Sequence, residues 1–162
     1  MRKRLAFGGL AAVLLVAASM SLAAANSSDT QSWEGRGVKI IRLVATPTEV
    51  TQLDLGKEGQ SQGDQIVFAD DLFRNGRKVG EDGVVCSLIR VEPSSAVYNC
   101  AGTLSLPSGQ ITFQGLTVLP PGSEPFVVAI TGGTGAYRTA RGEMEVQVVS
   151  QQEERYKLKL IL

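Results

Sequence analysis

The stretch PFVVAITGGTGAYRTARGEMEVQVV, residues 125–149, decides the fold of this chain. A run of β-branched and aromatic residues enters Gly132-Gly133-Thr134-Gly135, and a second, alternating run follows Arg141. Because glycine adopts positive φ angles at little cost, this spacing predicts two strands that meet at a sharp corner. A nucleotide-binding loop is excluded. Arg138 stands where a Rossmann fingerprint needs its third glycine, no Gly-Lys-Ser/Thr follows, and the later residues have the period of a strand rather than a helix.

Residues 1–25 have the pattern of a secretory signal peptide. Basic residues at positions 2–4 precede an apolar run over residues 5–18, and the segment ends in the small residues Ala23-Ala24-Ala25. We expect cleavage after Ala25 and a secreted protein, extracellular or in the cell envelope. The apolar run is short and follows a positive charge, so a permanent membrane anchor is disfavoured.

Removal of residues 1–25 leaves 137 of the 162 residues, enough for one domain with a hydrophobic core. We expect residues 26–37 to form a flexible N-terminal lead-in and residues 38–162 to form a β-barrel domain. This part holds 13 Lys and Arg residues against 16 Asp and Glu residues, a net charge near −3. The acidic balance disfavours a nucleic-acid partner.

The sequence has no histidine and only two cysteines. The commonest general base and metal ligand is therefore missing, and Ser-His and Cys-His nucleophile pairs are excluded; we expect no metal and no cofactor. Cys86 and Cys100 lie on either side of the turn expected at residues 92–95, so they would face each other on a hairpin. Export would also place them in an oxidising compartment, where thiols form disulfides. We predict a structural disulfide between them, with two buried free thiols as the alternative.

Short β-rich runs separated by turn residues predict about eight strands and no helix after the signal peptide. Asn75-Gly76 is the strongest short hairpin signal. The expected strands are residues 38–45, 65–73, 84–91 with a kinked beginning at 77–83, 96–106, 110–119, the two runs around the glycine corner, and 154–162. This pattern is typical of an antiparallel sandwich or an up-and-down barrel. We favour an all-β, eight-stranded antiparallel up-and-down β-barrel, whose interior is wide enough for side chains or one small ligand.

Two of the expected strands, residues 40–44 and 84–91, are apolar on both faces. The outer face of such strands would meet water in a lone barrel, so either loops or other subunits must cover it. We therefore expect an oligomer.

The string GGTGAYRTARG, residues 132–142, resembles the GGTG-x-[FY]-R-x-A-R-G signature of dirigent proteins and of the related allene oxide cyclase barrel. Residues 67–72, VFADDL, with Val79-Gly80 are similar to the dirigent V-F-x-D-D-x-L region, and residues 109–116 resemble the strand before the corner. The resemblance covers residues 38–162. It implies an eight-stranded barrel, usually a homotrimer, that binds a small hydrophobic or phenolic ligand without a cofactor and steers its cyclisation or coupling. Such an activity would be that of a cyclase, an isomerase or a stereo-directing protein.

Three acidic residues are candidate catalytic groups. Asp70 and Asp71 are adjacent, so on a strand they point to opposite faces and one of them can enter the barrel. Inside an apolar barrel a carboxyl group has a raised pKa and can act as an acid. Glu81, between two glycines, is a weaker candidate. The alternative is that these residues cap loop amides at a hairpin end.

Arg141 and Arg138 could donate hydrogen bonds to a ligand oxygen at the barrel mouth. Alternatively, an arginine locks the corner by pairing with Asp70, Asp71 or Glu143. We also expect aromatic side chains to contact a ligand, although each of them can instead be part of the core. These aromatic candidates are Tyr98, Tyr137 and Phe113.

Two functions from different classes remain. The first is confinement of a small hydrophobic or phenolic molecule so that it cyclises or couples in one way. The second is a non-catalytic carrier or a structural envelope barrel. A cavity of about 300 Å³ or more with inward Asp, Arg or Tyr side chains would favour the first, and a barrel filled with Leu, Val and Phe would favour the second.

Overall fold

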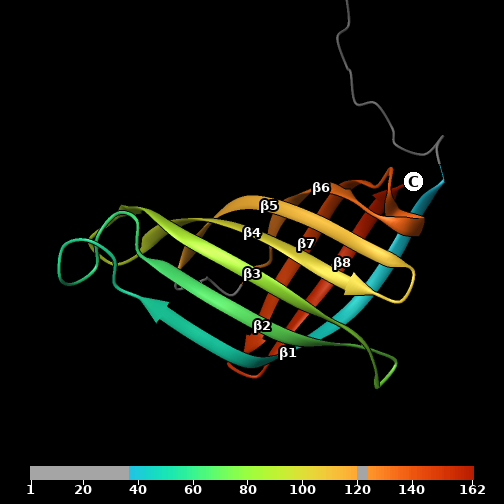
Figure 1. The fold of residues 1–162 in the computed structure, drawn as a ribbon, viewed down its shortest axis with the longest axis horizontal. Coiled ribbons are helices and arrows are strands. Elements are labelled where there is room, and N and C mark those ends of the chain that lie inside the picture. Colours follow the sequence, from blue (N-terminus) through green and yellow to red (C-terminus); the bar gives the residue numbers. More distant parts are fainter. Residues whose placement is uncertain (1–36, 120–123) are drawn as a thin grey trace, which may run out of the picture. The chain divides into compact units, whose positions relative to one another are not determined.

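The computed structural model describes residues 37–119 and 124–162. These residues form a closed antiparallel barrel in which each strand pairs with the next one and β8 pairs with β1 (Figure 1). The elements are β1 (Val38–Leu53), β2 (Gln65–Arg74), β3 (Arg77–Val91), β4 (Ala96–Leu106), β5 (Gly109–Leu119), β6 (Phe126–Gly133), the 3₁₀ helix η2 (Gly135–Tyr137), β7 (Arg141–Ser150) and β8 (Glu153–Ile161). The predicted eight-stranded barrel is confirmed, and the sandwich is excluded. The expected signal peptide, and the lead-in up to residue 36, lie outside the described residues.

Tight turns join most of the strands. Asn75 and Gly76, with φ angles of 52° and 73°, connect β2 to β3 in the left-handed conformation of a two-residue hairpin. Pro107 and Ser108 connect β4 to β5. Such short loops place consecutive strands side by side, so the chain order is also the order of strands around the barrel.

The first strand is longer than the sequence predicted. We expected it to end at Ala45, but β1 continues through Pro47 to Leu53 and pairs with β2 along this second half. The ladder shifts register between Pro47 and Glu49, where a proline that lacks an N–H donor is tolerated. The Thr48 hydroxyl donates a hydrogen bond to the Ala69 carbonyl at 2.7 Å and so links the two strands at the irregularity.

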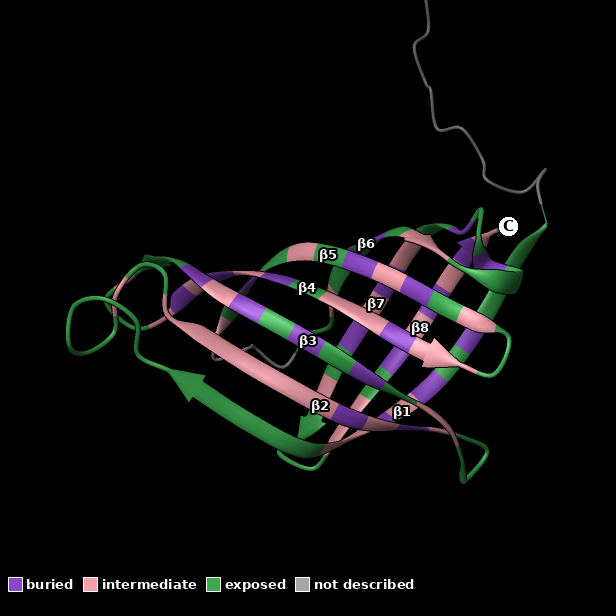
Figure 2. Cartoon of the chain, in the orientation of Figure 1, coloured by how far each residue is buried: buried purple, intermediate pink, exposed green. Residues whose placement is uncertain are grey.

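Side chains alternate between the interior and the surface along much of β3, β4 and β8 (Figure 2). The largest fully buried side chains fill much of the interior: Leu72, Leu88, Leu104, Ile111, Met144, Leu158 and Leu160. The Asp70 and Asp82 carboxyl groups break this apolar pattern, because both are buried among these residues.

The glycine corner closes one end of the barrel. Thr134 accepts a hydrogen bond through its side chain from Gln110 N–H at 3.0 Å and returns one from its own N–H to the Gln110 carbonyl at 2.9 Å. Gly135 has a φ of 58°, and a Cβ atom there would collide with the Ser108 carbonyl. The corner is therefore fastened to the β4–β5 turn, with Tyr137 buried beneath it.

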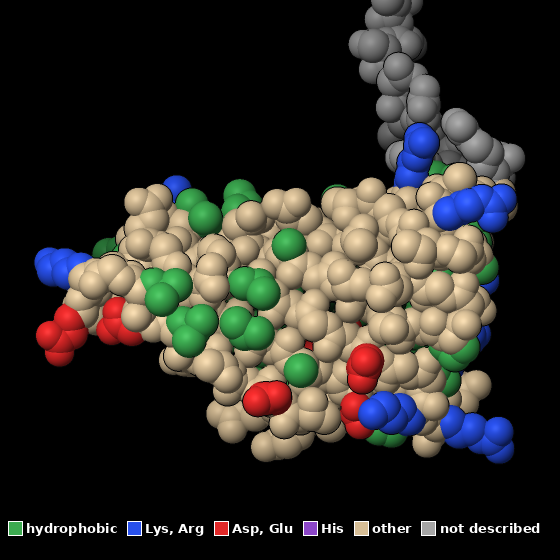
Figure 3. All heavy atoms as spheres, in the orientation of Figure 1, with side chains coloured by type: hydrophobic (Ala, Val, Ile, Leu, Met, Phe, Trp, Pro, Cys, Tyr) green, Lys and Arg blue, Asp and Glu red, His purple; other side chains and the backbone are tan. Residues whose placement is uncertain are grey.

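The predicted disulfide is present between Cys86 and Cys100, which are directly opposed on β3 and β4. Several large apolar side chains stay exposed on the outer face. Figure 3 shows hydrophobic side chains gathered over β3, β4 and β5. We call the following residues the outer apolar patch: Val85, Ile89, Val97, Leu116 and Val118. Of these, Leu116 is the most exposed, at 64%. No helix within residues 37–119 and 124–162 has the length and apolar character needed to cross a membrane.

Candidate functional site

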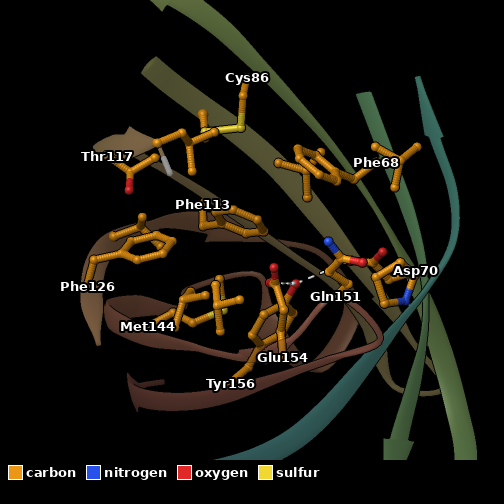
Figure 4. Close-up of a pocket in the computed structure, with 18 of the residues that line it drawn as sticks. Phe68, Asp70, Cys86, Phe113, Thr117, Phe126, Met144, Gln151, Glu154 and Tyr156 are labelled. Atoms are coloured by element: carbon orange, nitrogen blue, oxygen red, sulfur yellow. Dashed lines mark hydrogen bonds between the residues drawn. A yellow bond between two sulfur atoms is a disulfide. The ribbon is translucent and has the colours of Figure 1, made fainter. Parts of the chain in front are cut away.

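The barrel interior is hollow toward the end where β7 turns into β8. This cavity has a volume of about 340 Å³. Its walls come from all eight strands and are mainly apolar; Asp70, Gln151 and Glu154 lie on one side and Thr117 on the other (Figure 4). The apolar lining consists of Pro47, Val50, Phe68, Val84, Cys86, Cys100, Phe113, Leu119, Phe126, Val128, Met144, Val146 and Val148. Such a volume with few polar groups is typical of a small-molecule site.

Phe113 is placed in the cavity wall by a glycine on the neighbouring strand. Gly102 on β4 is the direct partner of Phe113 on β5, and a Cβ atom at Gly102 would collide with the Phe113 ring. The missing side chain therefore lets the ring lie against the sheet. Phe68 and Phe126, from β2 and β6, supply two further aromatic rings to the same cavity (Figure 4).

Carboxyl groups and a phenol form the polar end of the cavity. The Tyr156 hydroxyl lies 3.2 Å from Glu154 Oε2 and 3.4 Å from Asp70 Oδ2, so it donates a hydrogen bond to one of them at a time (Figure 4). All three side chains line the cavity. Asp82 on β3 is the direct strand partner of Asp70 on β2 and is buried with it, but it does not line the cavity.

Burial controls the protonation of this cluster. Burial raises the pKa of Asp70, and the neighbouring Asp82 and Tyr156 side chains partly oppose this rise. Burial, followed by the charge of Asp70, raises the pKa of Asp82 to about 8. The pKa of Glu154 is raised by burial and by the Asp70 charge, and burial raises that of Tyr156 as well. The cluster therefore holds a carboxylic acid proton at neutral pH.

No lysine or arginine of the described residues forms an ion pair with Asp70, Asp82 or Glu154. Within residues 37–119 and 124–162, no group of three or more acidic or cysteine side chains is arranged to hold a metal ion. The described site is therefore an apolar cavity with an uncompensated acidic end.

Comparison with known proteins places this barrel in a family. The profile described as "Allene oxide cyclase barrel like domain" matches residues 44–162. The chain belongs to the allene oxide cyclase barrel like family. The resemblance seen in GGTGAYRTARG is thereby confirmed.

Solved structures with this allene oxide cyclase barrel like fold include one similar in sequence. A pyocyanin demethylase is 37% identical, with a TM-score of 0.67, over 75% of this chain and 99% of that chain. An exo-specific intermolecular Diels-Alderase is 14% identical, with a TM-score of 0.60, over 76% of this chain and 98% of its own. A pterocarpan synthase dirigent protein is 14% identical, with a TM-score of 0.56, over 83% of this chain and 92% of its own. The last two share the fold. A search of the curated proteins found no match.

Two of the predicted ligand-facing residues line the cavity of this allene oxide cyclase barrel like protein, namely Asp70 and Phe113. Asp71, the neighbour of Asp70, points outward and pairs with Lys78. Alternation along β2 separates the two aspartates in the way that the sequence predicted.

The other predicted site residues do not line this cavity. Glu81, Arg138 and Arg141 are exposed, and Tyr98 and Tyr137 are buried elsewhere in the core. The corner lock expected for Arg141 is not formed among the described residues. Arg141 begins β7 on the outer face, where Glu143 instead pairs with Lys159 across the β7–β8 ladder.

Sequence reasoning missed Asp82, Glu154 and Tyr156 as site residues. The two-residue alternation of side chains along a strand could have indicated them. Asp82 precedes the inward-facing Val84 by two positions, and Glu154 precedes Tyr156 by two on a strand whose alternate residues Tyr156, Leu158 and Leu160 are apolar. The family signature gave no indication of these residues, because residues 132–142 lie at the corner.

Proposed function

We propose that this barrel binds a small planar aromatic molecule and transforms it by proton transfer at Asp70, Glu154 and Tyr156. The observation that carries the proposal is a mainly apolar cavity of about 340 Å³ in which the two carboxyl groups, Asp70 and Glu154, lie together with the Tyr156 hydroxyl. The aromatic rings of Phe68 and Phe113, together with the sulfur atoms of the disulfide and Met144, are favourable neighbours for a flat, polarisable ring system.

The acidic end favours a ligand that carries positive charge or hydrogen-bond donors. Asp70 and Glu154 face the cavity without a basic partner among the described residues, so a cationic ring nitrogen would supply the missing countercharge. Pyocyanin, an N-methylated phenazine with one oxygen substituent on a ring carbon, has this combination. The similarity of 37% to a pyocyanin demethylase supports an N-alkylated phenazine as the ligand class.

The chemistry supported by these groups is acid–base catalysis. Asp70, which accepts hydrogen bonds from its neighbours, is suited to take a proton, while the Tyr156 hydroxyl is suited to donate a hydrogen bond to a ligand oxygen. The raised pKa of Glu154 brings this carboxyl closer to the pH at which it can exchange a proton. In a balanced demethylation, Asp70 takes a proton from the N-methyl carbon, and the electron pair of that C–H bond passes into the phenazine ring, which is reduced by two electrons. Water then adds to the oxidised N-methylene carbon and the C–N bond breaks, releasing formaldehyde and a reduced hydroxyphenazine.

The experiment compares pyocyanin with phenazine, which has the same ring system without the charge or the oxygen. Fluorescence quenching should show pyocyanin binding at least about tenfold more tightly, a difference of roughly 1.4 kcal/mol. Mass spectrometry should show loss of the N-methyl group with the wild type and not with Asp70→Asn. Equal binding of the two probes, or full conversion by Asp70→Asn, would refute the proposal.

A second candidate is confinement without acid–base catalysis, in which the cavity steers the cyclisation or coupling of a hydrophobic or phenolic molecule. The almost entirely apolar lining favours this reading. In that case Asp70→Asn should leave the product distribution unchanged. A non-catalytic carrier, finally, would bind such a molecule and release it unaltered.

We also propose that the protein is exported after cleavage at Ala25 and assembles as a homotrimer. The basic, apolar and small-residue segments of positions 1–25 support export. The outer apolar patch supports assembly, because monomers rarely leave such surfaces in water. N-terminal sequencing of the exported protein should begin at Asn26, and a sequence beginning at Met1 would exclude the cleavage.

A further inference from the structure

We propose that Asp82 is a positioning residue: as a neutral carboxylic acid behind the cavity wall, it donates a hydrogen bond to Asp70 and holds Asp70 as the anionic carboxylate that faces the ligand. This inference rests on the function proposed above and concerns the regulation of the same site. It assigns a role to a side chain that has no contact with the ligand space.

The first observation is the register of β2 and β3. Asp70 and Asp82 are direct partners in this ladder, and both side chains point inward, as do those of Leu72 and Val84 beside them. Directly opposed residues of an antiparallel pair have Cβ atoms about 4.5–5.5 Å apart, so the two carboxyl groups are held close together. Like charges at this separation inside an apolar core repel strongly.

The second observation is the hydrogen-bond accounting. If both groups were ionised, Asp70 Oδ1 and both carboxyl oxygens of Asp82 would be buried without a donor. Unsatisfied buried oxygens of this kind are costly. A proton on Asp82 reduces this cost, since one Asp82 oxygen then donates to Asp70 while the Tyr156 hydroxyl can serve the other Asp70 oxygen; the remaining Asp82 oxygen is then a neutral carbonyl rather than part of a charged carboxylate.

Among the described residues, the surroundings of Asp82 compensate little for a charge on it: the Tyr156 phenol lowers its pKa, but burial and the Asp70 charge outweigh this effect. The polar groups that act on Asp82 are Asp70 on β2 and Tyr156 and Glu154 on β8. Its direct partner on β4 is the apolar Leu104. No basic side chain of the described residues pairs with any of these acids. The raised pKa of Asp82, about 8, agrees with a group that remains protonated at neutral pH.

The arrangement predicts a particular pH response. Between the raised pKa of Asp70 and about pH 8, Asp82 keeps its proton and Asp70 carries the single negative charge of the pair. Above that pH, a second charge appears beside Asp70, the hydrogen bond between them is lost, and the cavity-facing carboxylate is no longer fixed. Activity toward pyocyanin should therefore decline on the alkaline side with a midpoint near the pKa of Asp82.

The test compares Asp82→Asn with Asp82→Leu. The amide can donate the same hydrogen bond but cannot ionise, whereas leucine can do neither. At pH 7, Asp82→Asn should retain at least about tenfold more kcat/KM for pyocyanin than Asp82→Leu, the usual worth of one hydrogen bond to a charged group. The alkaline decline should disappear in Asp82→Asn and persist in Glu145→Gln, a control at an exterior carboxylate paired with Lys157.

A second readout does not depend on the ligand. Carbon-13 NMR of aspartate carboxyl groups should show one residue titrating near pH 8 in the wild type, and this signal should be absent from Asp82→Asn. If the signal is found but pyocyanin is not converted, the proposed function fails while the role of Asp82 in the pair stands. The inference is overturned if no aspartate titrates above pH 6, or if Asp82→Asn is as inactive as Asp82→Leu, since a hydrogen-bond donor at this position would then do nothing for activity.

Discussion

Cys86 and Cys100 are direct partners across β3 and β4, and their disulfide forms part of the cavity wall rather than a clamp on the surface. Both cysteines are buried, with relative exposures of 4% and 6%. The covalent bond therefore sets the local spacing of two strands that also contact the ligand space.

Loss of this disulfide should lower both stability and ligand affinity. The cysteines are 14 positions apart, and closing a loop of this size contributes about 3 kcal/mol by the chain-entropy argument. The Cys86→Ala/Cys100→Ala variant should unfold at a correspondingly lower denaturant concentration and bind pyocyanin more weakly. Two titratable thiols in the oxidised, denatured wild type would contradict the bond itself.

Adjacent aspartates should give opposite results. Asp70→Asn removes the charge that faces the cavity, so turnover should fall at least about tenfold. Asp71→Asn changes only an exterior pair with Lys78, so its stability cost should be below about 1 kcal/mol and its turnover close to that of the wild type. Steady-state kinetics measures the two turnover rates. If Asp71→Asn lost more turnover than Asp70→Asn, the site would lie outside the barrel.

Asp82 gives folding stability an unusual pH dependence. Its pKa is raised from 3.8 to about 8, so between these values the folded state holds a proton that the unfolded chain has lost. The free energy of unfolding should therefore fall as pH rises through this interval, by up to about 1.4 kcal/mol per pH unit from this group, and level off above it. Urea unfolding at several pH values should show a smaller decline for Asp82→Asn. Identical slopes for the two proteins would argue against the buried acid.

Assembly should depend on the outer apolar patch. Leu116→Glu places a charge at its most exposed position and should shift the protein from trimer toward monomer, because the charge would have to be desolvated at an interface. Analytical ultracentrifugation at micromolar concentration measures the change. Arg155→Glu, which alters an exposed side chain on β8 paired with Glu153, serves as a charge-changing control away from the patch. A wild-type protein that is monomeric at this concentration would contradict assembly through the outer apolar patch.

Arg141→Ala should be nearly silent. The side chain is exposed and pairs with no carboxylate among the described residues, so the loss of unfolding free energy should be under about 1 kcal/mol. Pyocyanin binding should also be unchanged, since Arg141 does not line the cavity. A loss of 3 kcal/mol or more would show that this arginine does lock the corner, as one reading of the sequence had it.

The fold could be predicted because its signals are local. Asn75-Gly76, the glycine corner and the period of two each act over a few residues, and together they fix strands and turns. The extension of β1 beyond Ala45 could not be foreseen in the same way. Pro47 is unfavourable in a strand, and only the partner strand β2 makes the irregular pairing there possible.

The site was harder to predict because it depends on register between strands. The sequence could place Asp70 or Asp71 inside the barrel, but the encounter of Asp70 with Asp82 requires the β2–β3 pairing, and that with Tyr156 links positions 86 residues apart. Nothing in a local pattern specifies such meetings. Arg141 was proposed as a ligand contact because it belongs to a conspicuous motif, but that motif forms a structural corner and does not line the cavity.

The pairing of Val38 with Ile161 brings the first and last strands of the barrel together. A short Gly-Ser linker could therefore join residue 161 to residue 38, and the chain could be reopened between Asn75 and Gly76, in an exposed turn. Such a circular permutant would keep all eight strand pairings, because each strand would retain both of its neighbours. Since every strand contributes to the cavity wall, the cavity would also be rebuilt. Because the barrel is closed, no strand is structurally first, and we expect circular permutants opened at other exposed turns to form the same barrel and cavity.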